Sequence, residues 1–399
     1  MHRSILFLLA CVAAAPLSAQ SLMPDQVVST IIIRPLALPN PVLGSDNRKH
    51  LAFELLVTNP SKDFITIEGV TIVGPDGADL SSQSGAGLTD MTKTFAGSGN
   101  RMGPGEARLL FQDVSFPADA PMPAAVSPRL TILRAVADAS GKPGPYPTDA
   151  PFPARATFTG APIAIQAGAR VIDAPLRGAG WLAGNGCCDT ISSHRGALLP
   201  VDGQLFVPER FAIDWLQMDR SGRLFTGDSK KLQSYVFYGA TVHSVADGVV
   251  VNAYDQADEQ VPVGTAKGVT PANIGGNMLV VDIGGGAFAF YAHLQRGSLK
   301  AKIGDRVKTG EVLGLLGNTG NTDAPHLHFH LMDGPVPIAS NGLPFVLRRF
   351  SSQGFLPDSQ IDALFEGKVA VPDGKGRGVH SNELPLNSEV VDFDAPPGG

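Results

Sequence analysis

The stretch that decides the fold of the second half of the chain is "NTDAPHLHFHLMDG", from Asn321 to Gly334. Within it His326, His328 and His330 occupy every second position and alternate with apolar residues. Alternate side chains of a β-strand point to the same face, so the pattern predicts a strand with three imidazoles on one side. Neutral imidazole is a leading ligand for zinc, and we therefore expect this strand to contribute to a metal site.

The composition favours an all-β protein. The 399 residues are 43% hydrophobic, which is enough for about two domains with real cores. Glycine (46) and proline (32) are abundant while charged residues are only 17%, as expected for many short strands joined by turns. The net charge is -6 and no basic block is present, which argues against nucleic acid as a partner.

The first residues, "MHRSILFLLACVAAAPLSAQ", predict a secretory signal peptide over residues 1–19. A basic start is followed by an apolar run and a small-residue exit, and the run is too short for a transmembrane segment. Cys11 leaves open a lipoprotein alternative, in which it would carry a lipid anchor. We expect an exported protein, periplasmic or extracellular.

Residues 20–165 are predicted to form an immunoglobulin-like β-sandwich. The evidence is a series of short β-branched or alternating runs separated by turn residues. The runs are "TIIIRPL", "LAFELLVTN", "FITIEGVTIV", "ARLLFQDV", "RLTILRAV" and "ARATFTG". The region lacks a cluster of histidines, cysteines or paired carboxylates in its sequence, so we interpret it as a packing or spacing module.

The rest of the chain divides into three predicted parts. Residues 166–204 form a linker and an N-terminal extension of a second β domain, which occupies residues 205–350. Residues 351–399 form a C-terminal extension, expected to be mostly disordered after 368 because Pro, Gly, Asp and Glu dominate there. Apart from Cys11, the cysteines are the adjacent Cys187 and Cys188. They can form a vicinal disulfide, stay free or pair with other chains, and we expect a purely local role.

The second domain resembles a known family through four ordered blocks. These are "AIDW", "GATVHSVADGVV", "YAHL" and "IGDRVKTGEVLGLLGNTGNTDAPHLHFHL", which span roughly residues 205 to 340. Together they resemble the lysostaphin-like (LytM-type) zinc metallopeptidases, peptidoglycan endopeptidases that cut peptide cross-links in bacterial cell walls. The resemblance implies an antiparallel, barrel-like β metallopeptidase domain of the duplicated hybrid motif type, with a substrate groove.

The resemblance also implies roles for individual residues, with Zn2+ as cofactor. His328 and Asp214 correspond to zinc ligands. His326 corresponds to the residue that accepts a proton from the attacking water or orients it. His293, in the "YAHL" block, corresponds to the second catalytic histidine, which steadies the oxyanion.

One position departs from the family pattern. The family places a zinc-binding histidine four residues before the aspartate, and here that position is Arg210, which stays protonated and offers no lone pair. A catalytic zinc site normally has three protein ligands, so a third must come from elsewhere or be missing. We favour His194 as a tentative third ligand. His330 remains an alternative ligand or a residue that supports a ligand without touching the metal. Arg210 is expected to hold a substrate carboxylate or form a surface ion pair.

Two functions from different classes follow. The first is an exported zinc endopeptidase that hydrolyses peptide bonds of peptidoglycan, or, with the same chemistry, of other exported proteins. The second is a degenerate, non-catalytic family member that binds the wall or regulates a partner hydrolase. Arg210 favours the second function, whereas the presence of Asp214, His293, His326 and His328 together favours the first.

Overall fold

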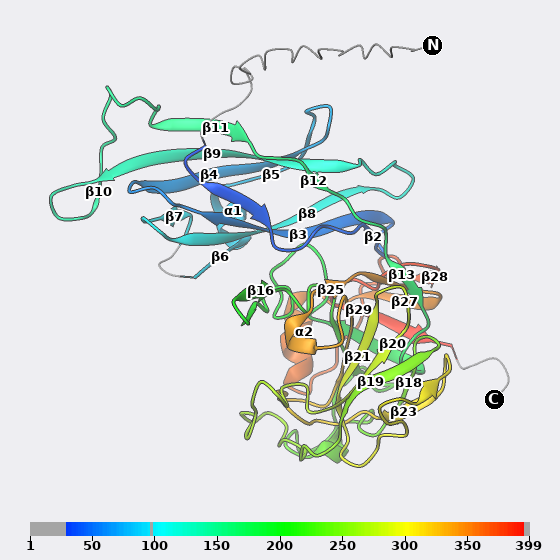
Figure 1. The fold of residues 1–399 in the computed structure, drawn as a ribbon. Helices are drawn as coiled ribbons and strands as arrows, with labels where there is room; N and C mark the ends of the chain where they lie inside the picture. Colours follow the sequence, from blue (N-terminus) through cyan, green and yellow to red (C-terminus); the bar gives the residue numbers. More distant parts are fainter. Residues whose placement is uncertain (1–28, 96–98, 395–399) are drawn as a thin grey trace, which may run out of the picture.

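The computed structural model describes residues 29–95 and 99–394, which form two β domains one above the other (Figure 1). The signal peptide and Cys11 lie outside the described residues. Within the described ranges, no helix is both long and apolar enough to cross a membrane. The all-β prediction is confirmed.

The N-terminal domain consists of two antiparallel sheets that share one apolar core. The first sheet has the order β1-β3-β8-β6, with β2 paired to β3. Its strands are β1 (Ile32–Pro35), β2 (Val42–Leu43), β3 (Arg48–Thr58), β6 (Thr92–Thr94) and β8 (Ala107–Pro117). The second sheet has the order β10-β9-β4-β5, with β7, β11 and β12 paired at its margins. Its strands are β4 (Phe64–Val73), β5 (Asp79–Ser84), β7 (Arg101–Met102), β9 (Ala125–Ala137), β10 (Pro143–Gly144), β11 (Arg155–Thr159) and β12 (Ile163–Ala164). A short helix, α1 (Gly85–Asp90), follows β5.

Alternation along β3 explains why this domain is a sandwich. Leu51, Phe53, Leu55 and Val57 point into the shared core, where they meet residues of β4 and β9. The intervening side chains of β3 face the other way, yet almost all of them are buried as well. The reason is that the second domain covers this outer face. A sandwich is therefore observed, while its likeness to immunoglobulin domains remains a prediction.

The second domain is built around one long sheet with the order β22-β19-β20-β21-β24-β17-β14-β29-β27-β28. Its strands are β14 (Gly178–Gly184), β17 (Ile213–Gln217), β19 (Gly248–Tyr254), β20 (Asn277–Asp282), β21 (Phe288–Leu294), β22 (Arg306–Val307), β24 (Leu327–Met332), β25 (Gly342–Leu343, paired to β24), β27 (Phe350–Phe355), β28 (Gly378–His380) and β29 (Glu389–Phe393). The pairings along it are antiparallel, as expected.

Smaller elements complete the domain. The paired strands are β13 (Arg170–Ile172) with β26 (Phe345–Leu347), β15 (Leu199–Val201) with β16 (Gln204–Phe206), and β18 (Thr241–His243) with β23 (Val312–Leu315). The helical elements are η1 (Leu232–Ser234), η2 (Pro337–Ala339) and α2 (Asp358–Phe365). The predicted linker thus contributes β13 and β14 to the domain itself.

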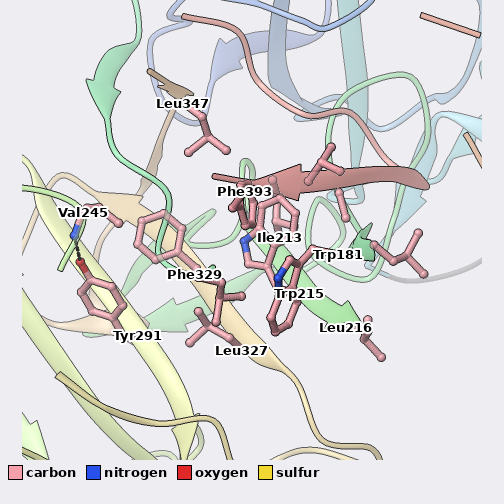
Figure 2. Packing of buried hydrophobic residues seen from close by; sticks show 14 of the residues in the cluster. Trp181, Ile213, Trp215, Leu216, Val245, Tyr291, Leu327, Phe329, Leu347 and Phe393 are labelled. Carbon is pink, nitrogen blue, oxygen red and sulfur yellow. Dashed lines mark hydrogen bonds between the residues drawn. The ribbon is translucent and has the colours of Figure 1, made fainter. Parts of the chain in front are cut away.

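The prediction of disorder after residue 368 is wrong for most of that segment. Strand β29 lies between β14 and β27 inside the sheet, and Val390 and Val391 are fully buried. Phe393 packs edge-on against Trp215, with ring centroids 5.2 Å apart (Figure 2). The polar composition around this strand concealed a five-residue strand, "EVVDF", whose burial depends on distant partners.

The core of the second domain positions the strands that matter for function. Trp215 of β17 and both Leu327 and Phe329 of β24 lie in one apolar cluster, visible in Figure 2. Since side chains alternate along a strand, the neighbours of these residues in the sequence point to the opposite face of the sheet. Asp214 precedes Trp215 and His328 lies between Leu327 and Phe329, and the two residues lie directly opposite each other in the β17–β24 pairing.

Candidate metal centre and catalytic site

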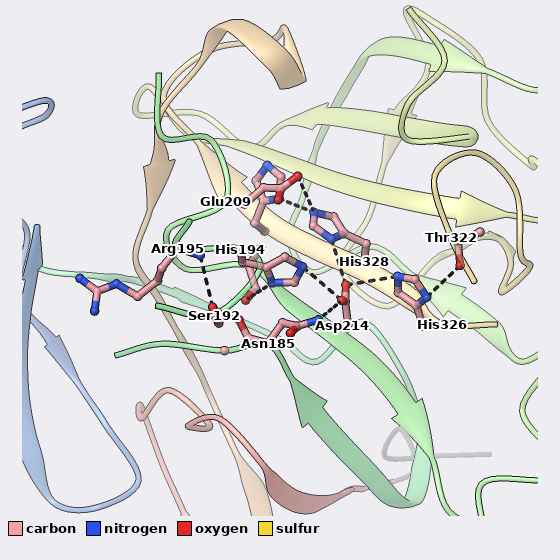
Figure 3. Close-up of polar contacts among 12 residues, drawn as sticks. Asn185, Ser192, His194, Arg195, Glu209, Asp214, Thr322, His326 and His328 are labelled. Carbon is pink, nitrogen blue, oxygen red and sulfur yellow. Dashed lines mark hydrogen bonds and ion pairs between the residues drawn. The ribbon is translucent and has the colours of Figure 1, made fainter. Parts of the chain in front are cut away.

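Asp214 is the centre of the predicted site. Its Oδ1 lies 3.0 Å from Nδ1 of His328 and 3.2 Å from Nε2 of His326. Its Oδ2 lies 3.2 Å from Nε2 of His194 and accepts a hydrogen bond of 2.8 Å from Nδ2 of Asn185. Figure 3 shows the three rings converging on this carboxylate. The structure thus brings together the residues that sequence analysis selected.

His194 reaches the site from a loop and not from a strand. The loop, residues 185–198, runs between β14 and β15. Nδ1 of His194 donates to the backbone carbonyl of Ala212, 3.0 Å away, which turns Nε2 towards Asp214. The ring meets that of His328 edge-on, with centroids 4.8 Å apart. His194 therefore approaches the carboxylate from the side opposite His326, as Figure 3 shows.

The donor set of His194, Asp214 and His328 fits a zinc ion. One ligand atom from each of the three residues lies within 4.8 Å of the others, and all three residues are buried. Two imidazoles and one carboxylate form a common donor set of catalytic zinc sites, which keep a further position for water.

His293 is held in a strained backbone conformation. Its φ is +61°, which is uncommon for a residue with a Cβ and typical of functional sites. Nδ1 donates to the carbonyl of Thr319 at 2.7 Å, so Nε2 is the nitrogen left for the site. The Thr319 backbone approaches closely enough that a Cβ on Gly276 would lie 2.2 Å from its carbonyl oxygen. Gly276 thus permits the contact that orients His293.

His326 is oriented in the same way. Its Nδ1 donates to the carbonyl of Ala324, 2.8 Å away, and lies 3.3 Å from Oγ1 of Thr322. This leaves Nε2 facing Asp214. The rings of His326 and His293 have centroids 4.6 Å apart, so both present Nε2 to the same region beside the carboxylate. They form a pair suited to proton transfer.

His330 contacts a ligand candidate and does not face Asp214 directly. Its Nδ1 lies 2.9 Å from Nε2 of His328, so it fixes the ring of His328 from behind. Nε2 of His330 is buried and lacks a partner in the described part of the chain. The carboxylate of Glu209 lies 4.0 Å from Nε2 of His328. The position of His330 fits an outer-shell residue, as considered from the sequence.

The electrostatics follow from burial and the central carboxylate. Burial tends to raise the pKa of Asp214, but the charges of His194 and His326 outweigh it and hold that pKa well below its usual range. Burial tends to lower the pKa of His194, yet Asp214 raises it to about 9. Asp214 likewise raises the pKa of His326 against burial. Burial, assisted by His326 and His328, lowers the pKa of His293 well below its usual range.

Arg210 is neither a surface residue nor a group that faces the pocket. It is 2% exposed, and its Nε lies 2.9 Å and 3.0 Å from the two carboxylate oxygens of Glu54, a residue of β3. A second bond joins a terminal nitrogen of Arg210 to the same carboxylate. The expected surface ion pair or substrate contact is therefore corrected to a buried ion pair between the two domains.

The cluster opens into a pocket of about 650 Å³. Phe290 and Ala292 of β21 line it beside the histidines. The surrounding segments contribute Gly264 to Ala266, Asn321 to Asp323, Leu199, Pro337 and Ile338. The site is thus accessible from a cavity whose walls mix apolar and polar side chains.

Sequence reasoning missed three contributors to the site. Asn185, which binds Asp214, and Thr319, whose carbonyl orients His293, carry no motif that marks them. Glu209 lines the pocket, and its position directly before Arg210 was a usable signal.

Cys187 and Cys188 form a disulfide with each other, which was one of the alternatives left open. This disulfide lies in the loop that carries His194.

Comparisons with known proteins agree with the region identified from sequence. Residues 232–340 match the model of peptidase family M23. The chain is 30% identical over 122 residues to glycyl-glycine endopeptidase ALE-1 of Staphylococcus capitis, covering 30% of this chain and 29% of the relative. It is 28% identical over 142 residues to peptidoglycan DD-endopeptidase ShyA of Vibrio cholerae, covering 31% and 32%.

The chain thus spans about a third or less of the length of these curated relatives. A solved structure, the catalytic domain of lysostaphin from Staphylococcus simulans, is 21% identical. That match covers 41% of this chain and 86% of the other, with a TM-score of 0.22. The family match lies within the domain that carries Asp214 and the histidine cluster, and it contains the "YAHL" and "HLHFHL" blocks. Residues 232–340 of this chain are accordingly similar to peptidase family M23.

Proposed function

We propose that the protein is an exported zinc endopeptidase that hydrolyses peptide bonds of peptidoglycan. The observation that carries the proposal is the convergence of His194, Asp214 and His328, with ligand atoms within 4.8 Å of one another. The arginine at the expected ligand position left the site one ligand short in sequence. His194 fills that deficit from a different segment.

The ligands are oriented by their own hydrogen bonds. The carbonyl of Ala212 fixes Nδ1 of His194 as a donor and leaves Nε2 for the metal. His328 would use Nδ1, the atom that faces Asp214, while its Nε2–H donates to Nδ1 of His330. Loss of the His194 proton is required, because only the neutral ring has a free lone pair.

Zinc held by these three residues would supply Lewis-acid activation of a water molecule and of a peptide carbonyl. His293 and His326 then provide the proton transfers. Nδ1 of His293 donates to the carbonyl of Thr319, and burial keeps the ring neutral. Nε2 of His293 therefore carries a free lone pair that is suited to accept a proton from water. His326, held by Asp214 in a state that favours its proton, is suited to donate to the developing oxyanion or the leaving amine.

This division of roles reverses the one implied by the family resemblance, in which His326 accepts and His293 donates. The two rings are close enough to exchange roles during a full cycle. What supports our assignment is the hydrogen-bond arrangement around each ring together with the opposite directions of their pKa shifts.

The substrate class rests on the relatives. The family match, a glycyl-glycine endopeptidase and a peptidoglycan DD-endopeptidase support a wall peptide as substrate. The predicted signal peptide supports export to the compartment that contains the wall. A pocket that mixes apolar and polar side chains suits a short peptide in extended conformation.

The test combines metal content with hydrolysis. The mature chain is purified, its zinc is measured by mass spectrometry of the metal, and isolated peptidoglycan is digested and its products identified by liquid chromatography. We expect about one zinc per chain and new free amino termini in wall peptides. Zinc without cleavage of any wall substrate would favour the non-catalytic alternative. Cleavage of unfolded exported proteins but not of peptidoglycan would retain the chemistry and change the substrate.

A further inference from the structure

The outer face of β3 and β8 is a docking surface inside the molecule. Leu56, Leu109 and Phe111 on this face form an apolar cluster against which Ile191 and Leu198 pack. Those last two residues come from the loop of residues 185–198, the same loop that carries His194. The sandwich therefore contacts the His194 loop on both sides of the histidine.

Polar contacts hold the same loop between its apolar anchors. Arg195 directly follows His194, is 1% exposed, and donates from Nη2 to the backbone carbonyl of Gln112 on β8, 3.1 Å away. Its guanidinium lies over the ring of Phe111, 5.4 Å from the centroid. Lys93 of β6 donates to the carbonyl of Gly196. Figure 3 shows the Arg195 side chain leaving the site towards the blue ribbon of the sandwich.

Glu54 connects the sandwich to the other side of the site. It is fully buried in the middle of β3, between Ala52 and Leu56 on the outer face. It binds Arg210, four residues before Asp214, and its Oε1 lies 4.0 Å from Nη2 of Arg195. A single buried carboxylate thus lies between the segment that leads into β17 and the segment that carries His194.

We infer that the N-terminal sandwich is a structural part of the metal site, and that Glu54 is a positioning residue for two of its three ligands. Glu54 and Gln112 hold Arg210 and Arg195, and these in turn fix the approach of Asp214 and His194. The inference rests on the proposed zinc function. It also explains why Arg210 is compatible with a metal site, since the arginine anchors the partner domain that delivers the replacement ligand.

The test is zinc affinity of the full chain, measured by competition with a chromophoric chelator. Glu54→Gln keeps the shape of the side chain but removes its charge, and it is expected to weaken zinc binding about ten-fold or more, as loss of an outer-shell partner does. The zinc-induced increase in melting temperature should shrink in parallel, because binding and stability are linked. A purely structural role would lower the melting temperature of both forms equally and leave zinc affinity unchanged.

Two further variants make the result decisive. Glu68→Gln removes the acid of an exposed ion pair with Arg155 on the same domain and should bind zinc like the wild type. Arg195→Lys keeps the charge but loses the planar guanidinium, and it decides the question if Glu54→Gln does not fold. If every folded variant of Glu54 and Arg195 binds zinc with wild-type affinity, the inference is overturned while the proposed zinc function stands. A wild-type chain that binds no zinc overturns the proposed function, and the inference with it.

Discussion

Nε2 of His194 lies 3.2 Å from Oδ2 of Asp214, although one residue sits on a loop and the other on a central strand. The distance fits two groups that share a metal ion after removal of a proton. Arg210, which occupies the ligand position of the family pattern, points the other way to Glu54. His194 lies 20 positions before Asp214 in the sequence, and under the proposed function it supplies the third ligand in place of Arg210.

The first prediction concerns His194 itself. His194→Ala should lower zinc affinity about as strongly as His328→Ala, since each removes one of three protein ligands. The measurement is zinc content after dialysis against a weak chelator. His243→Ala is a matched control, because His243 bonds to Thr241 and to the Gly310 carbonyl away from the site. Full zinc retention in His194→Ala would show that the ligand assignment is wrong.

His293→Ala and His326→Ala should behave differently from the ligand variants. Both are expected to keep zinc while losing activity about 100- to 10,000-fold, because they take part in proton transfer. Zinc content and initial rates of peptide hydrolysis are measured on the same preparations. If zinc is lost from either variant to the extent seen in His328→Ala, that histidine is a ligand and its assigned role must be abandoned.

His330 offers a test of how the His328 ring is oriented. His330→Leu removes the acceptor for Nε2–H of His328, and we expect zinc affinity to fall about ten-fold. His330→Gln can place a carbonyl oxygen near the same point and should restore much of the affinity. Chelator competition compares the two variants directly. Equal zinc affinities of His330→Leu and His330→Gln would mean that the His328 ring is held by packing alone.

A pH dependence is expected in the sandwich domain. Burial tends to lower the pKa of His50, but hydrogen bonds to Asp113 and Asp46 raise it from 6.5 to about 9. Because the pKa is higher in the folded state, His50 stabilises the protein fully below about pH 6.5, and this contribution disappears as the pH rises through about 9. Below about pH 6.5 the pKa difference of His50 between the unfolded and folded states adds about 3 kcal/mol to the free energy of unfolding, because one pKa unit corresponds to about 1.4 kcal/mol.

The measurement is the free energy of unfolding of wild type and His50→Gln in urea at several pH values. The gap between the two proteins should be largest near pH 6 and should narrow towards pH 10. A gap that stays constant across this range would mean that His50 contributes through packing and neutral hydrogen bonds only.

The shared face of His326, His328 and His330 could be predicted from local periodicity, whereas Asp214 and His293 were assigned through the family resemblance. The alternation in "HLHFHL" places the imidazoles on one face, and the β17–β24 pairing then sets Asp214 opposite His328. The contribution of His194 is different in kind. His194 lies on a loop that packs against the other domain. In the sequence it was indicated only because a zinc site needs three protein ligands and Arg210 cannot be one of them. Glu54 stands alone in an apolar run, a signal that indicates a buried ion pair without naming its partner.

The C-terminal strand was missed for a related reason. Short strands have weak signatures, and "EVVDF" is surrounded by residues typical of disordered tails. Its place in the sheet is decided by β14 and β27, which are distant in sequence. Local composition therefore gave the wrong result where long-range pairing determines the structure.

The position of β29 between β14 and β27 has a consequence for the order in which the molecule is made. During synthesis β14 emerges about 200 residues before the strand that must pair with it, as the numbering shows. Until then one edge of β14 stays open, and the second domain cannot complete its sheet on the ribosome. Contacts of such long range fold slowly. The sheet of the second domain therefore closes only after the last of its strands has been made.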